Sequence, residues 1–168
     1  FSRMNLFINH VFGKATLMQG TGATSAVNID LDNDGEIDTR INLLRFYESG
    51  RTGAGTFPSS VPGFSLSITI INPKSRGNIV LKNGFAEIDP GYLSDNEDIK
   101  NIKKALLFSL KLFKNHKFHG YVDEILEYDE IKKNMDNFIS NNVYSGYHLI
   151  GGTSKLVGKN FNVKNIGL

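Results

Sequence analysis

Cysteine is absent from the 168-residue sequence, which excludes disulfides, thiolate metal sites and a cysteine nucleophile. An excess of one charge is also absent, because 19 basic and 17 acidic residues leave a net charge of only +2. So small a charge gives no reason to expect a nucleic acid as partner. Apolar stretches such as 105–110 are far shorter than the roughly 20 residues of a membrane-spanning helix, so we expect no membrane span.

The chain nevertheless has the composition of a folded protein, since 40% of its residues are hydrophobic and can supply the core of one domain. It contains no internal repeat and no low-complexity tract, so a single α+β unit is expected. The first residue is Phe1, and no basic-then-apolar leader precedes it. We therefore expect the chain to be part of a longer polypeptide. The missing cysteines leave its cellular compartment open.

Alternation of apolar and polar residues predicts strands over 37–46, 64–71 and 78–81. The segment 48–63 is rich in glycine, serine and proline and is typical of a long loop. Residues 1–29 have weak periodicity, so no element is predicted there.

Two helices are predicted in the second half of the chain. Ser94 and Glu97 have the spacing of a capping box, which predicts a helix that starts there and ends near Asn115. A second helix is predicted over 129–140. The apolar stripe of the first helix consists of Ile99, Ile102, Leu106, Leu110 and Phe113, and that of the second of Ile131, Met135, Phe138 and Ile139.

The segment from Asp30 to Asp38 places carboxylates at alternate positions before Gly35, as a calcium-binding loop does. With Asp30 as the first ligand, however, the position of the bidentate glutamate is occupied by Ile41. The same run of Asp, Asn and Gly is also ordinary turn chemistry. A calcium-binding secreted module is accordingly an alternative interpretation.

Histidine is the residue type that could carry catalysis. His116 and His119 are three residues apart, but they lie among lysines without nearby carboxylates, and we expect no metal site there. His10 has no informative context. His148 follows Tyr147 and precedes a glycine-rich segment; a lone histidine of this kind is more often structural than catalytic.

Three segments resemble, in order, the glucose-methanol-choline (GMC) family of flavin oxidoreductases. Residues 71–81 (INPKSRGNIVL) are similar to that family's turn between two strands, and residues 88–98 (IDPGYLSDNED) to its entry into a long helix. Residues 147–153 (YHLIGGT) are similar to its catalytic histidine segment, with one additional glycine. The resemblance covers 64–168 and extends loosely over 1–63. The double glycine resembles insect members, among which are sugar dehydrogenases and ecdysone-type oxidases.

The resemblance implies that residues 1–168 belong to the substrate-binding domain, a mainly antiparallel sheet with packed helices. It implies oxidation of an alcohol, sugar or sterol-type substrate by hydride transfer to FAD, which a domain outside this chain would mainly bind. His148 would be the base that takes the hydroxyl proton, and Tyr147 would lie against the cofactor. A second catalytic His or Asn would lie beyond Leu168. A relative that does not oxidise its ligand, such as a lyase or binding protein, is the other alternative.

Overall fold

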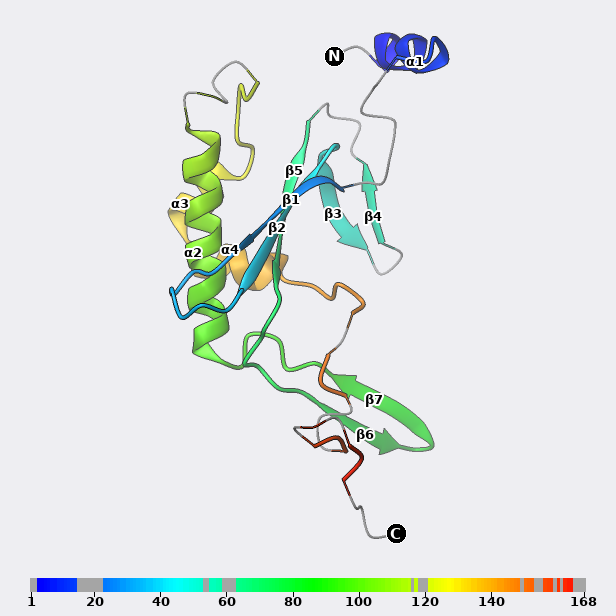
Figure 1. The fold of residues 1–168 in the computed structure, drawn as a ribbon, viewed down its shortest axis with the longest axis vertical. Coiled ribbons are helices and arrows are strands. Elements are labelled where there is room, and N and C mark those ends of the chain that lie inside the picture. Colours follow the sequence, from blue (N-terminus) through cyan, green and yellow to red (C-terminus); the bar gives the residue numbers. More distant parts are fainter. Residues whose placement is uncertain are drawn as a thin grey trace.

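The computed structural model describes residues 3–14, 23–52, 55–58, 63–115, 117, 121–148, 150–152, 156–158, 160 and 162–164. These residues form antiparallel sheets and several helices, which confirms the predicted α+β class (Figure 1). Within them, no helix combines the length and the apolar character needed to cross a membrane.

The central element is an antiparallel sheet with the strand order β1-β2-β5, formed by Ala23–Ile29, Thr39–Leu44 and Ser65–Ile70. Ile41 is paired with Val27 on one side and with Ile68 on the other. Because opposed residues share a face, these side chains form an apolar surface, in which Ile41 is 2% exposed. The predicted strands at 37–46 and 64–71 are confirmed, whereas β1 was not predicted.

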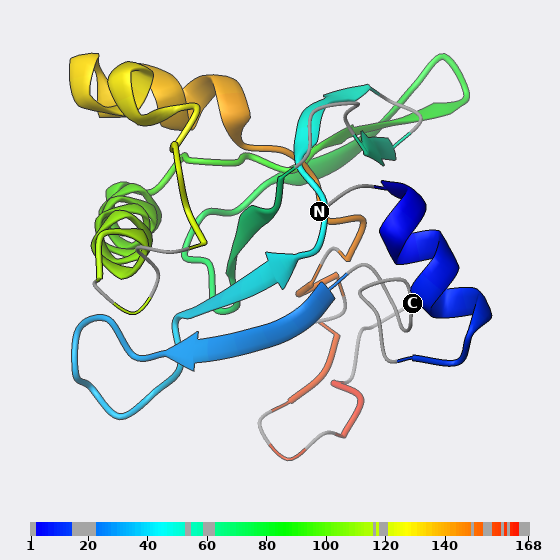
Figure 2. The same cartoon turned by 90° about the horizontal axis from the view of Figure 1, so that it is seen from above.

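Helix α2 (Asn96–Phe113) packs on β2 and β5 (Figures 1 and 2). The predicted apolar stripe is only half-buried. The buried residues of α2 lie beside this stripe, and they are Asp98, Asn101, Ala105 and Ser109. Small side chains at Ala105 and Ser109 bring the helix close to the sheet, and the Ser109 hydroxyl is satisfied by the Ala105 carbonyl at 2.9 Å.

The N-cap of α2 is Asp95, not Ser94 as predicted. The Asp95 carboxylate accepts a hydrogen bond from the Glu97 amide at 2.8 Å. The Ser94 amide instead donates to the Gly91 carbonyl, so Ser94 belongs to the preceding turn. The positive end of the helix dipole also stabilises a carboxylate at this position.

The predicted second helix is two helices, α3 (Tyr128–Lys133) and α4 (Met135–Asn142). Asn134 separates them in an extended conformation, and its side chain caps α4 by accepting from the Asn137 amide at 3.0 Å. The prediction failed because asparagine competes with the helix for backbone hydrogen bonds. Ile131 and Ile139 are buried as predicted.

Two hairpins complete the described structure. The predicted loop at 48–63 is wrong, since it contains β3 (Glu48–Thr52) paired with β4 (Gly55–Pro58). The predicted strand at 78–81 is confirmed as β6 (Asn78–Lys82), which pairs with an unpredicted strand, β7 (Phe85–Asp89). An additional helix, α1 (Arg3–Val11), lies at the opposite end of the molecule from β6 and β7 (Figure 1).

Candidate active site

Two of the three segments that carry the resemblance are joined by the Asp98 carboxylate. Asp98 is 4% exposed and accepts hydrogen bonds from the amides of Lys74 at 2.7 Å and Ser75 at 2.8 Å. The Ser75 hydroxyl in turn accepts from the Asp95 amide at 3.1 Å. Burial raises the pKa of Asp98, but the hydrogen bonds from Ser75 and Lys74 and the charge of Arg76 lower it below its ordinary value. The 71–77 turn is therefore fastened to the start of α2.

Arg76 supports the same turn from within. Its guanidinium donates to the carbonyls of Pro73 at 2.6 Å and Ser75 at 2.9 Å, and these bonds brace the turn.

Gly77 and Gly91 allow the two segments to touch backbone to backbone. A Cβ on Gly77 would lie 2.0 Å from the Asp89 carbonyl oxygen, and one on Gly91 would lie 2.4 Å from that of Arg76. Gly91 also has a φ of +61°, whereas the φ of Gly77 is ordinary. Gly77 is thus required by a close backbone approach and not by a positive φ.

Replacement of Gly77 by alanine is expected to destabilise the fold by about 1–3 kcal/mol, because the backbone of residues 89–90 must move to admit the methyl group. The change would be read from urea denaturation. Gly146→Ala is the matched control: nothing lies near its Cβ, so its unfolding curve should stay close to that of the wild type. An equally stable Gly77→Ala protein would contradict the close approach.

The third segment presents His148 to solvent. After α4 the chain runs through 143–148 toward the end of the molecule that holds β6 and β7 (Figure 1). Tyr147 has a φ of +61°, uncommon for a bulky residue, and its amide is held by the Ser145 hydroxyl at 2.9 Å. Within the described residues, the exposed side chain of His148 forms no hydrogen bond.

The segment after His148 is only partly described. Gly151 has a φ of +81°, which favours glycine at this position of the double-glycine segment. Tyr147 is 66% exposed. His116, His119 and the side chain of His10 lie outside the described residues, so the structure does not test the predictions made for them.

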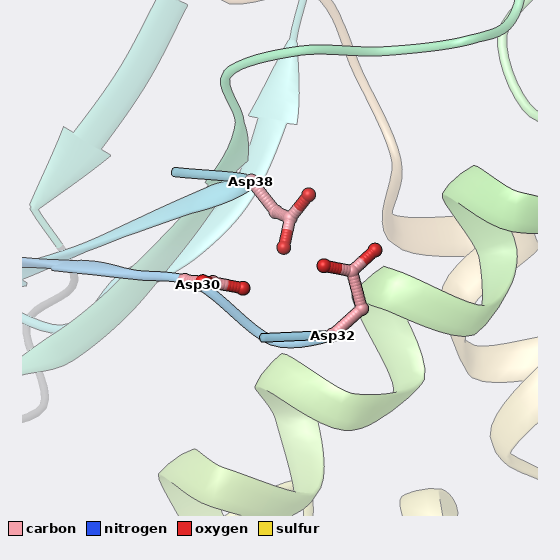
Figure 3. A group of neighbouring side chains, drawn as sticks. All are labelled: Asp30, Asp32 and Asp38. Atoms are coloured by element: carbon pink, nitrogen blue, oxygen red, sulfur yellow. The ribbon is translucent and has the colours of Figure 1, made fainter. Parts of the chain in front are cut away.

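The loop between β1 and β2 brings together the carboxylates of Asp30, Asp32 and Asp38, whose oxygen atoms lie within 4.8 Å of one another (Figure 3). Asp30 accepts from the amides of Asn33 at 2.6 Å and Gly35 at 2.9 Å. The hydrogen bond from Gly35 lowers the pKa of Asp30, although burial opposes it.

Ile41, which falls at the last ligand position of the calcium pattern, is buried in the sheet and cannot serve as a ligand. Asp38 occupies the cluster instead, because the pairing of β1 with β2 returns the chain to Asp30. Asp38 also accepts from the Leu31 amide at 2.8 Å. Helix α2 passes beside the loop (Figure 3). The Lys104 ammonium donates to the Leu31 carbonyl at 3.1 Å. These hydrogen bonds help to hold the loop in place.

No protein-family model matches the chain, and no curated protein matches it either.

Proposed function

We propose that the chain is the substrate-binding part of an FAD-dependent oxidoreductase that acts on an alcohol, a sugar or a sterol-type substrate. The observation that carries the proposal is the exposure of His148, whose imidazole forms no hydrogen bond within the described residues. A structural histidine would be expected to be buried and satisfied. An exposed imidazole is accessible to a substrate, and the positive φ of Tyr147 beside it is a conformation that clusters at functional sites.

The contact between the other two segments, 71–81 and 88–98, supports the same proposal. Hydrogen bonds from Lys74 and Ser75 to Asp98 join parts of the chain more than 20 residues apart. The residues that resemble the family are thus the ones that build this junction, together with Gly77 and Gly91. Such a junction would hold the β6–β7 hairpin and the start of α2 in fixed positions.

In the proposed reaction, His148 takes the hydroxyl proton of the alcohol on the imidazole nitrogen that faces it. Loss of this proton leaves the oxygen able to form a carbonyl group as the adjacent carbon gives up hydride. Bound FAD would supply the acceptor for that hydride. An imidazole suits the role of base because it ordinarily titrates close to neutral pH.

The described residues include a base for this chemistry but do not form a binding site of the Rossmann kind for the dinucleotide. All of their strand pairs are antiparallel, whereas a dinucleotide site of the Rossmann kind requires a parallel βαβ unit. FAD would therefore be held mainly by another part of the polypeptide. Tyr147, which is 66% exposed, would contact it from this chain.

The proposal is tested by expressing the complete coding region and mixing the purified protein anaerobically with alcohols, sugars and sterols. We expect the protein to retain FAD and its flavin absorbance to bleach with one of these classes, which would also identify the substrate class. A flavin-bound protein that none of them reduces would instead favour a lyase or a binding protein. A protein without flavin would contradict the proposal.

Calcium binding by the loop of Asp30, Asp32 and Asp38 is the second candidate, favoured by the convergence of three carboxylates. It predicts that millimolar calcium raises the melting temperature, that EDTA reverses the increase and that Asp32→Asn abolishes it. Asp123→Asn, at an exposed carboxylate outside the loop, is the control. If the wild-type melting temperature is the same with calcium and with EDTA, the loop is not a calcium site.

A further inference from the structure

A cavity of about 500 Å³ lies where the C-terminal half of α2 meets α3 and the start of α4. Figure 2 shows α2 almost end-on, in green, with α3 and α4 beside it in yellow to orange. The apolar part of the cavity is formed by Leu107, Leu110, Ile131 and Met135. Leu107 is 54% exposed, so a ligand in the cavity would remove apolar surface from water.

Four lysines surround this apolar surface, namely Lys111, Lys114, Lys132 and Lys133. Asp136 is the one carboxylate among the described residues that line the cavity, and it is paired with Lys103 at 2.5 Å. In the described part of the chain, none of the four lysines forms an ion pair. The described lining of the cavity therefore carries four lysines and one carboxylate, an excess of positive charge.

Tyr128 fixes the position of two of these lysines. The Lys114 ammonium lies 2.6 Å from the Tyr128 hydroxyl and 4.1 Å from the centre of its ring, and the Lys132 ammonium lies 5.7 Å from that centre. The hydrogen bond from Lys114 lowers the pKa of Tyr128, although burial opposes it. Both cations are thus held at the rim of the cavity.

We propose that this cavity binds a small amphipathic organic anion, with its acidic group among the lysines and its apolar chain on Leu107 and Met135. Charge-assisted hydrogen bonds from lysine would hold the acidic group. The adjacent depression shares Lys114 with the cavity, but it is also lined by three carboxylates, which would repel an extended polyanion; they belong to Asp123, Glu124 and Asp129. The ligand is therefore small and carries its charge at one end.

Octanoate is the probe, and its binding to the expressed protein would be measured by isothermal titration calorimetry. We expect binding that weakens as salt is added, because the head group is held by charge. Lys114→Gln and Lys132→Gln should each weaken it about tenfold, the loss expected for one charged hydrogen bond. Leu107→Gln should weaken it too, since it removes apolar contact without disturbing a buried residue.

Lys100→Gln is the matched control, because Lys100 lies on α2 but outside the cavity. The affinity of this variant for octanoate should equal that of the wild type. Circular dichroism of each variant checks that the fold is kept. Three results would overturn the proposal: no binding of octanoate, equal binding of octan-1-ol, or equal binding of inorganic phosphate. If folded Lys114→Gln and Lys132→Gln proteins bind octanoate as tightly as the wild type, the ligand does not bind in this cavity and the proposal is wrong.

Discussion

Replacement of His148 by alanine or glutamine in the complete protein is expected, under the proposed function, to slow the reduction of bound flavin by alcohol at least about a hundredfold. Without the imidazole, the hydroxyl proton has no acceptor as hydride leaves the carbon. The rate would be measured by stopped-flow absorbance under anaerobic conditions, so that one reduction is observed without turnover.

The flavin content of the His148 variants should equal that of the wild type, because the dinucleotide is expected to be held mainly outside this chain. His116→Gln is the matched control, since His116 lies among lysines in the sequence and no catalytic role is expected of it. It should reduce its flavin at the wild-type rate. If a His148 variant does so as well, His148 is not the base.

Asp98→Asn is expected to lower the free energy of unfolding by about 2–4 kcal/mol, the largest stability effect anticipated here. The buried carboxylate accepts from the amides of Lys74 and Ser75, and an asparagine turns an NH₂ group toward one of them. Urea denaturation at neutral pH measures the loss. Asp123→Asn, at an exposed carboxylate, should change stability by less than about 0.5 kcal/mol.

The stability difference between wild type and Asp98→Asn should also depend on pH in one direction. The pKa of Asp98 is lowered in the fold from its ordinary value of 3.8, so the folded state prefers the charged carboxylate. Its contribution is complete above the unfolded-state pKa and is lost as the pH falls through the lower folded-state pKa. The difference should therefore shrink below pH 3.8. A difference that grows on acidification would contradict this account of Asp98.

Some elements could be predicted from sequence because local chemistry determines them. The alternating runs of β2 and β5 and the amphipathic pattern of α2 are local signals, and all three elements were found. A usable signal was missed at Asn83 and Gly84, which have φ values of +53° and +82°. An Asn-Gly pair between apolar runs is the strongest short-range indication of a hairpin, and it would have revealed β7.

Other features depend on tertiary contacts that no local pattern contains. Asp98 and Asn101 are buried because α2 lies against the 71–77 turn and the sheet, although their polarity predicts exposure. Asp38 joins the acidic cluster only because β1 and β2 pair in a particular register. The lysines of the cavity come from two separate segments, at the end of α2 and in α3, which only the packing of these helices brings together.

The candidate base was identified differently. A resemblance of short segments, and not periodicity or spacing, singled out His148 from the other histidines. The structure adds that its imidazole is exposed and follows a residue with positive φ.

The most direct test of the account is the sequence of the coding region on both sides of residues 1–168. We predict a Gly-x-Gly-x-x-Gly motif after a strand upstream of Phe1 and a catalytic His or Asn downstream of Leu168. Both would complete an FAD-dependent oxidoreductase around His148. Stop codons or unrelated domains in their place would contradict the proposed function and leave a domain without a flavin to reduce.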